Sequence, residues 1–317
     1  MDTLITAIIV VVGVPAVVCG YIIATEWAIR GLQSGTKARV RPWLWVLPAF
    51  LFLGTFLIYP TIRTFVNSLF DRQGNFNGFG NYVDLFTSGD FWRVLLNNAL
   101  WIVIFTGVVL VLGLIIAVLT DRVRYETLAK AVIFIPMAIS FVAAGVIWNF
   151  MYNINPNVGT LNAGLTAIGL DAIPFIQNAP WNTIFLIIVG IWMWVGFAMV
   201  ILSAGLKGIS TELLEAARMD GATELQVFFR IILPLLAPTI AVVGTTVVIT
   251  ALKTFDIIYV MTGGLYNTSV IGFEFYQKQF TNRDPGAAAA VAIVLLIAIV
   301  PIMLINIRRF QAQEAIR

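Results

Sequence analysis

Two groups of polar residues interrupt the apolar stretches of this 317-residue sequence, and both could bind something. The first is a charged segment, LLEAARMDGATELQVFFRIILP, over Leu213–Pro234. The second lies inside an apolar stretch and contains Thr250, Lys253, Thr254 and Asp256. Polar groups within membrane-spanning segments cost free energy, so they usually face a cavity or a neighbouring helix. The second group therefore predicts a binding site within a membrane.

Residue sets for catalysis or metal binding are absent from the sequence. There is no histidine and Cys19 is the only cysteine, which excludes disulfides, His/Cys metal sites and Ser-His or Cys-His catalysis. No Gly-Lys pair occurs, so there is no G-x-x-x-x-G-K-[ST] phosphate-binding loop. We expect no enzymatic activity and no cofactor in this chain. If ATP powers the protein, it binds to another chain.

Composition and apolar runs predict an all-α polytopic membrane protein. The chain is 60% hydrophobic and 11% charged, whereas a soluble domain carries about 25% charged residues. Runs of roughly 20 apolar residues are long enough to cross a bilayer as helices. We predict seven transmembrane helices, at Leu4–Ala28, Trp43–Phe65, Leu95–Thr120, Leu128–Tyr152, Thr183–Gly205, Leu235–Thr262 and Ala287–Ile307.

The distribution of Lys and Arg predicts the orientation. Most of the 19 basic residues lie in or beside the segments after the first, third, fifth and seventh spans: Arg30, Lys37, Arg39, Arg41, Arg122, Arg124, Lys130, Lys207, Arg218, Arg230, Arg308, Arg309 and Arg317. Basic loops stay in the cytoplasm, which places the C-terminus inside and the N-terminus outside. The same rule accounts for the net charge of +3, so we expect membrane lipid and no nucleic acid as a partner.

The first span stands apart from the other six. A cleaved signal peptide is one interpretation, but the acidic start and the basic cluster after the span favour a retained helix. We therefore divide the chain into residues 1–42, an extra N-terminal transmembrane helix with a basic loop, and residues 43–317, a six-helix unit.

The segment around Gly221 has the signals of helix, glycine turn and helix. Ser210 is a suitable N-cap, and Gly221 is suited to end the first helix. Thr223 and Gln226 have the spacing of a capping box for the second helix. The first helix is too short to be stable alone in water, so something must hold it.

The charge of this short helix bears on what holds it. Lipid headgroups could hold an interfacial helix. However, Glu212, Glu215, Asp220 and Glu224 are opposed only by Arg218, and an anionic inner leaflet repels acidic faces. A protein partner on the cytoplasmic side is the better explanation.

The order of residues in this loop resembles the EAA signature of ABC-importer permeases. Glu215-Ala216-Ala217, Asp220-Gly221-Ala222, Ile231 and Leu233-Pro234 match that signature without a gap. The resemblance extends over most of the chain from Trp43 and is greatest to the maltose-transporter permease family, in particular to its α-glucoside-type permeases. Further matching motifs are Phe79-Gly80-Asn81-Tyr82, Phe91-Trp92, Asn97-Asn98, Phe255-Asp256, Val260-Met261-Thr262-Gly263-Gly264, TGGLYNTSVIGFEFY and INIRRFQAQEA.

The resemblance implies a role for the loop at residues 208–234. The helix before the glycine would be a coupling helix that docks into a cytoplasmic ATPase, with Glu215, Ala216, Ala217, Asp220 and Gly221 as the coupling residues. The implied partners are a second homologous permease in a heterodimer, two ATP-binding subunits and an extracytoplasmic solute-binding protein. The implied location is the bacterial inner membrane.

Sugar transport would require an aromatic platform beside neutral hydrogen-bonding groups, because sugars have apolar C–H faces and hydroxyl rims. The resemblance places Ser140, Trp194, Phe197, Thr250 and Thr254 at the sugar site, and we add Asp256 from its position in the sixth span. Several positions of that site that carry asparagine-like residues in the family are occupied here by Gly190, Ala251 and Thr254. The sugar site could therefore be reduced in this chain or lie mainly in the partner permease.

Plain structural roles are open for the same residues. Threonines can bond to their own helix carbonyls, and the tryptophans can pack or face lipid. Lys253 and Asp256, three residues apart on one predicted helix, could form a structural ion pair.

Other functions remain to be weighed against sugar import. An ABC importer for another solute has the same loop. An ion-coupled secondary transporter would need inverted repeats or ionisable broken spans, and a membrane enzyme would need a catalytic cluster. We find neither in the sequence.

Overall fold

The computed structural model describes residues 2–121 and 123–314, without the side chains of residues 2–5, 7–10, 14 and 305–314. Within that range, every regular element is a helix, beside one isolated bridge between Phe70 and Phe76. The prediction of an all-α protein is therefore confirmed. Arg122 and Arg317, which entered the orientation argument, lie outside the described residues. The chain divides into two compact units, Met1–Val66 and Asn67–Arg317.

The first unit is a helical hairpin. Helix α1 (Asp2–Ala28) is followed by α2 (Ser34–Leu53), which continues through a π-helical turn (Gly54–Ile58) into α3 (Tyr59–Asn67). Near the turn, Arg41 forms an ion pair with both oxygens of Glu26, at 2.7 and 2.8 Å. The second predicted span begins too late, because the helix already starts at Ser34.

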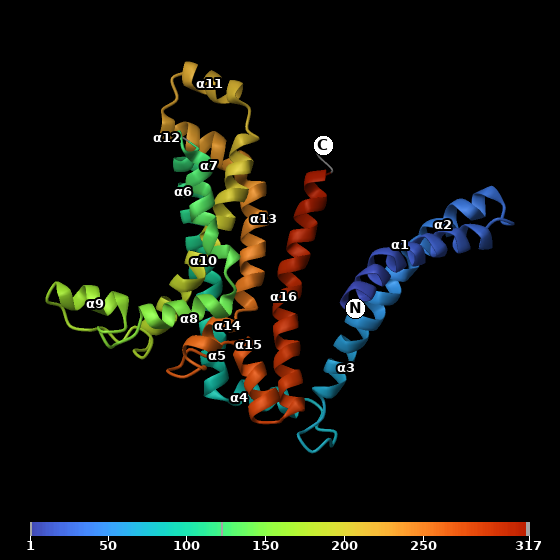
Figure 1. The fold of residues 1–317 in the computed structure, drawn as a ribbon, viewed down its shortest axis with the longest axis horizontal. Helices are drawn as coiled ribbons and strands as arrows, with labels where there is room; N and C mark the ends of the chain where they lie inside the picture. The colour runs from blue at the N-terminus through green and yellow to red at the C-terminus, as the bar shows by residue number, and fades with distance from the viewer. Residues whose placement is uncertain (1, 122, 315–317) are drawn as a thin grey trace. The chain divides into compact units, whose positions relative to one another are not determined.

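The second unit holds all the remaining helices (Figure 1). They are α4 (Gly80–Thr87), α5 (Gly89–Leu100), α6 (Thr106–Thr120), α7 (Glu126–Phe134), α8 (Phe141–Met151), α9 (Thr160–Ala167), α10 (Trp181–Lys207), α11 (Thr211–Met219), α12 (Glu224–Val227), α13 (Leu233–Leu252), α14 (Asp256–Met261), α15 (Ile271–Tyr276) and α16 (Pro285–Glu314). Pi-helical turns at Trp101–Phe105 and Phe228–Ile232 join α5 to α6 and α12 to α13, and another at Gln277–Thr281 follows α15.

Helix α10 is the centre of this unit. It packs against α6, α7, α8, α13 and α14, and Leu186, Met199 and Leu202 on it are completely buried. Small residues allow the closest approach: a methyl group on Gly113 of α6 would lie 2.6 Å from Cβ of Ala198. Close backbone approach at small residues is how membrane helices gain packing energy.

Two of the predicted spans are not continuous helices, and these predictions are wrong in that respect. The span predicted at Leu128–Tyr152 is α7 and α8, which meet at 98° after a 3-10 turn at Ile135–Ala138. Pro136 lies in that turn, and proline cannot donate the hydrogen bond that would continue the helix.

The span predicted at Leu235–Thr262 is broken as well. Helix α13 ends at Leu252, and α14 begins at Asp256. Between them Phe255 has φ −145° and ψ −55°, which is not helical. Irregular backbone at membrane depth is tolerated where it is buried in protein or lines a cavity, so both breaks point to a functional region.

Six described helices are long and apolar enough to cross a membrane, and the bent pair α7/α8 makes a seventh. The number agrees with the seven spans expected.

Candidate functional site

The loop around Gly221 has the predicted helix–turn–helix geometry. Helix α11 lies at one end of the second unit, beyond α10 and α12, and α4 and α15 lie at the other end (Figure 1). Gly221 has φ +84°, a left-handed conformation that suits glycine. Thr223 and Gln226 form the predicted capping box, with hydrogen bonds of 3.3 Å from N–H of Gln226 and 2.8 Å from N–H of Thr223.

The predicted coupling residues lie on an accessible helix. Glu215, Ala216, Asp220 and Gly221 are exposed, and Ala217 is half-buried. Ser210 occupies the N-cap position, although its side chain makes no capping hydrogen bond in the described structure. The second helix also extends further than expected, because α12 runs through a π-helical turn directly into α13, which was predicted to begin as a span at Leu235.

An ion pair joins the two arms of the turn. Nε and Nη2 of Arg218 donate to the two carboxylate oxygens of Glu224 at 2.7 and 3.4 Å. This hydrogen bonding to Glu224 raises the pKa of Arg218 above its ordinary value. The contact spans Gly221 and links α11 to α12.

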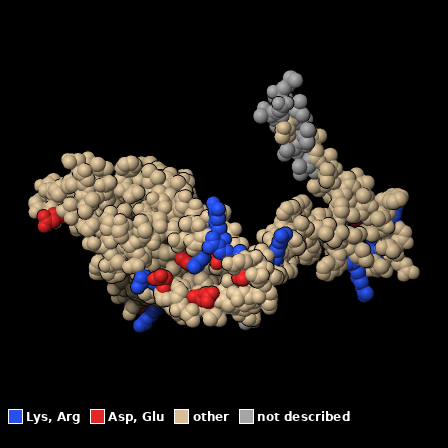
Figure 2. All heavy atoms as spheres, turned by 90° about the horizontal axis from the view of Figure 1, so that it is seen from below, with Lys and Arg blue, Asp and Glu red and all other residues tan. Residues whose placement is uncertain are grey.

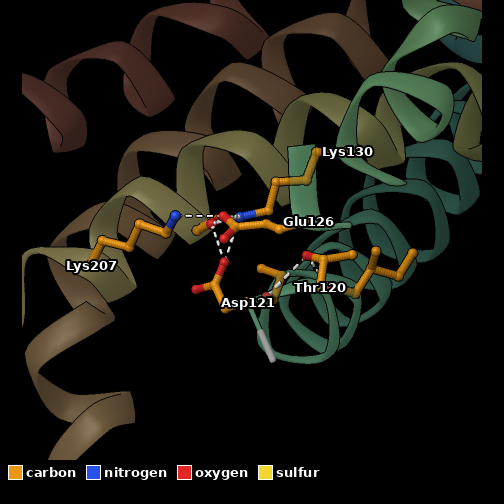
Figure 3. Close-up of polar contacts among 8 residues, drawn as sticks. Thr120, Asp121, Glu126, Lys130 and Lys207 are labelled. Carbon is orange, nitrogen blue, oxygen red and sulfur yellow. Dashed lines mark hydrogen bonds and ion pairs between the residues drawn. The ribbon is translucent and has the colours of Figure 1, made fainter. Parts of the chain in front are cut away.

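A cluster of charged and hydroxyl groups connects the base of this loop to two other helices, and it was not predicted from the sequence (Figure 3). We call Asp121, Glu126, Lys130, Ser203 and Lys207 the basal cluster. Nζ of Lys130 donates to Asp121, to Glu126 at 2.6 Å and to Ser203. Ser203 donates to Asp121 at 2.8 Å, and Lys207 donates to Glu126.

The basal cluster joins the end of α6, the start of α7 and the end of α10. Lys207 is the last residue of α10, immediately before the turn into α11. Glu126 and Lys130 have the i,i+4 spacing that forms ion pairs on helices. That spacing was the one signal in the sequence; the contacts to α6 and α10 depend on tertiary packing.

A pocket of about 280 Å³, the inner pocket, lies where α13 breaks. Four of the six predicted substrate residues line it, namely Trp194, Thr250, Thr254 and Asp256. Its other lining residues are Phe141, Ile249, Lys253, Phe255 and Ile257. The helix breaks thus bring residues of α8, α10, α13 and α14 to one place.

The other two predicted residues support the pocket from outside its lining. Oγ of Ser140 accepts a hydrogen bond from N–H of Ala143 at 3.1 Å and so caps α8 next to Phe141. The ring of Phe197 lies edge-on to Trp194, with the centroids 5.3 Å apart. Phe197 therefore packs against the Trp194 ring beside the pocket.

Both threonine hydroxyls in the inner pocket donate to backbone carbonyls of α13, close to the plain role considered above; Thr250 lies on that helix and Thr254 follows it. Thr250 donates to the carbonyl of Thr246 at 3.0 Å, and Thr254 donates to that of Thr250 at 3.3 Å. Each hydroxyl keeps acceptor capacity for a ligand. Lys253 and Asp256 do not share a helix face as predicted, because the helix ends between them, and no ion pair joins these two described residues.

Comparison with known proteins agrees with this architecture. Residues 109–309 match the family described as "Binding-protein-dependent transport system inner membrane component". An osmoprotective compounds uptake permease protein from Synechocystis sp. is 48% identical over 86% of this chain and 100% of its own length. An alpha-glucoside transport system permease protein from Rhizobium meliloti is 41% identical over 97% of both chains.

A solved structure has the same fold. One chain of a bacterial ABC transporter involved in the import of the acidic polysaccharide alginate superimposes with a TM-score of 0.74. Its sequence is 27% identical, and the match covers 87% of this chain and 99% of that one.

Proposed function

Because this chain belongs to the family of inner membrane components of binding-protein-dependent transport systems, we propose that it forms the path of a sugar across the inner membrane. It is a permease of an ABC importer. This family membership disfavours an ion-coupled secondary transporter. The substrate class proposed is an α-glucoside or a similar oligosaccharide, by analogy with the Rhizobium relative.

The observation that carries the proposal is the composition of the inner pocket. It combines the Trp194 ring with the acceptor oxygens of Thr250 and Thr254 and with the charged groups of Lys253 and Asp256. Such a mixture suits a ligand with an apolar ring face and a rim of hydroxyls. The pocket lies at a break in a spanning helix, the place where membrane transporters commonly bind their substrates.

The loop at residues 208–234 supports coupling to an ATPase. Exposed Glu215 and Ala216 and half-buried Ala217 lie on one short helix at the end of the unit. Closure of the ATPase would bias the equilibrium between inward-open and outward-open states, because it favours one position of α11. The proposed assembly contains this chain, a second permease, two ATP-binding subunits, which hydrolyse ATP, and a solute-binding protein.

We further propose the orientation with the N-terminus outside and the C-terminus in the cytoplasm, from the distribution of Lys and Arg. In this orientation α11 faces the cytoplasm, and α4 and α15 face outward. We call these two ends of the second unit the inner and the outer end. Residues 1–42 would act as an additional anchor beside a permease domain at 43–317.

A second substrate class is favoured by one observation. Lys253 and Asp256 line the inner pocket together, and a small zwitterionic solute could pair with both charges. The Synechocystis relative carries the description osmoprotective compounds. Uptake assays should therefore include glycine betaine beside the sugars.

The test is transport by the complete complex in proteoliposomes. Thr250→Ala and Trp194→Ala should lower uptake of maltose, an α-glucoside, at least fivefold while assembly and basal ATP hydrolysis stay normal. Glu215→Lys and Gly221→Pro should leave the protein inserted and abolish the stimulation of ATP hydrolysis by substrate. Unchanged uptake in both pocket variants would refute the site, and normal coupling in both loop variants would refute the docking role.

A further inference from the structure

A second and larger pocket lies at the outer end of the unit. We call it the outer recess; its volume is about 430 Å³. Its walls come from the first turns of α5, from the loop after α14 and from the π-helical turn after α15. Seen from this end, basic and acidic side chains lie intermixed in the middle of the surface (Figure 2). The volume falls in the range of small-molecule sites, about 300–1,000 Å³.

One wall of the outer recess is held in an unusual conformation. Gly263, Gly264, Tyr266 and Asn267 all have positive φ, between +56° and +72°. For Tyr266 and Asn267 this conformation costs free energy that the surroundings must offset. A loop held in this way presents its side chains in one fixed arrangement.

Buried amides hold this loop. Nδ2 of Asn97, only 5% exposed, donates to the carbonyls of Asn267 and Ser269 at 2.7 and 2.8 Å. Asn182 on α10 donates to the carbonyl of Tyr266 at 2.8 Å. The wall is therefore anchored to two separate helices before any ligand binds, which lowers the entropic cost of binding.

The charged groups of the recess are already paired. Arg93 lies 3.7 Å from Asp90 and donates to Oδ1 of Asn267 at 3.0 Å. Glu274 lies 3.6 Å from Lys278. Two cations and two anions leave no net charge, so the recess is not suited to an ionic ligand, which needs an unpaired partner.

Most of the remaining lining residues carry neutral hydrogen-bonding groups. Gln277 and Asn282 add side-chain amides, each with a carbonyl acceptor and two N–H donors. Oγ of Ser269 is buried and has no hydrogen-bond partner within the described structure. This atom is shielded from the recess, so the exposed amides of Gln277 and Asn282 are the neutral groups that a ligand there could reach.

From these features we propose that the outer recess is a second saccharide-binding site, which holds a neutral sugar before it reaches the inner pocket. The proposal rests on the proposed function as a sugar permease. Helix α14 connects the two sites, because the inner pocket includes its first residues and the recess includes Gly264 just beyond its last. Six helical residues span about 9 Å. The two sites therefore lie within reach of one oligosaccharide.

A pair of glutamines offers a matched test. Gln277 lines the recess and Gln279, in the same π-helical turn, does not. Each is replaced by Trp in a Trp194→Ala background, which weakens the inner pocket. Binding of maltose to the purified complex without the binding protein is then measured by saturation-transfer NMR. We expect Gln277→Trp to reduce the remaining signal at least fivefold and Gln279→Trp to leave it unchanged.

Two further measurements separate the possible failures. If the wild-type complex imports maltose but the Gln277→Trp and Gln279→Trp variants bind it equally, the second site is refuted and the proposed function stands. If the wild-type complex neither binds nor imports maltose, trehalose or sucrose, the proposed function fails and this site fails with it. If Gln277→Trp weakens only the affinity for the binding protein, the recess is a protein-docking surface and the proposal is overturned.

Discussion

Replacing Lys130 by Met tests whether the basal cluster holds the end of α10. The side chain of Lys130 is only 16% exposed, and its ammonium group donates to Asp121, Glu126 and Ser203. Methionine has nearly the same length but no charge and no donor. The substitution therefore removes the cation that lies between the carboxylates of Asp121 and Glu126, while Lys207 still binds Glu126.

The size of the effect follows from the exposure of the groups. Removing one partner of a fully buried ion pair costs about 3–5 kcal/mol, whereas an exposed pair contributes about 0–1 kcal/mol. The Asp121 and Glu126 side chains are 20% and 27% exposed, between these limits. We therefore expect Lys130→Met to lower the free energy of unfolding by about 2 kcal/mol.

Lys207→Met is the matched control. Lys207 binds the same oxygen of Glu126, but its side chain is 57% exposed and Glu126 is its one ion-pair partner among the described residues. Its loss should cost less than about 1 kcal/mol. Unfolding in mixed micelles with increasing dodecyl sulfate, followed by tryptophan fluorescence, measures both variants.

A second substitution tests the cause of the loss. In the Lys130→Met background, Asp121→Asn removes the carboxylate that has lost its ammonium partner and should recover part of the stability. In the wild-type background the same substitution should destabilise, because Lys130 then loses a partner. Equal effects of Lys130→Met and Lys207→Met, or no recovery by Asp121→Asn, would refute the assignment of the basal cluster as a structural lock.

Three further predictions concern single positions. Gly221→Ala adds a methyl group into open space but forces an L-residue to φ +84°. The substitution should cost about 1–2 kcal/mol locally and should weaken substrate-stimulated ATP hydrolysis without loss of membrane insertion. Full stimulation would show that the turn does not need a glycine. Gly196→Ala places Cβ 2.6 Å from the carbonyl oxygen of Ile133, so it should lower the free energy of unfolding by about 1–3 kcal/mol in the same unfolding assay. Wild-type stability of this variant would show that α7 can move away at no cost. Hydrogen bonds from the backbone of Asn75 hold the pKa of Asp71 below its ordinary 3.8. The stability that these hydrogen bonds add to the loop is fully present above pH 3.8 and is lost as the pH falls through the lowered pKa. The protection of the Asn75 amide against hydrogen exchange should fall over the same pH range. Equal protection in Asp71→Asn and in the wild type at pH 6 would contradict the role of the carboxylate.

Local signals in the sequence predicted the loop around Gly221 well. The turn, the capping box and the exposed acidic helix depend on residues within a few positions of each other, such as Thr223 and Gln226. Capping and glycine chemistry act over this distance. The continuation of α12 into α13 was not predicted. The next span was expected to begin at Leu235, whereas Pro234 lies in the first turn of α13, directly after a π-helical turn.

The basal cluster and the helix breaks show what a hydropathy pattern cannot predict. A window of apolar residues reports that a segment belongs in lipid, and it is insensitive to three non-helical residues such as Lys253–Phe255. Lys130 was counted as a basic residue that reports topology, but its partner Asp121 caps the end of α6 and its partner Ser203 lies on α10. Contacts between segments distant in sequence leave no periodic signal.

The two breaks also explain why the inner pocket lies where it does. A continuous helix satisfies its own backbone groups and presents mainly side chains to its neighbours, whereas a break frees N–H and C=O groups that must be satisfied elsewhere. The break after Leu252 and the start of α8 at Phe141 both adjoin the pocket. A ligand with many hydroxyls can both donate to and accept from such groups. The same breaks that defeat a prediction of straight spans therefore supply backbone polar groups to a site that also holds aromatic, aliphatic and polar side chains.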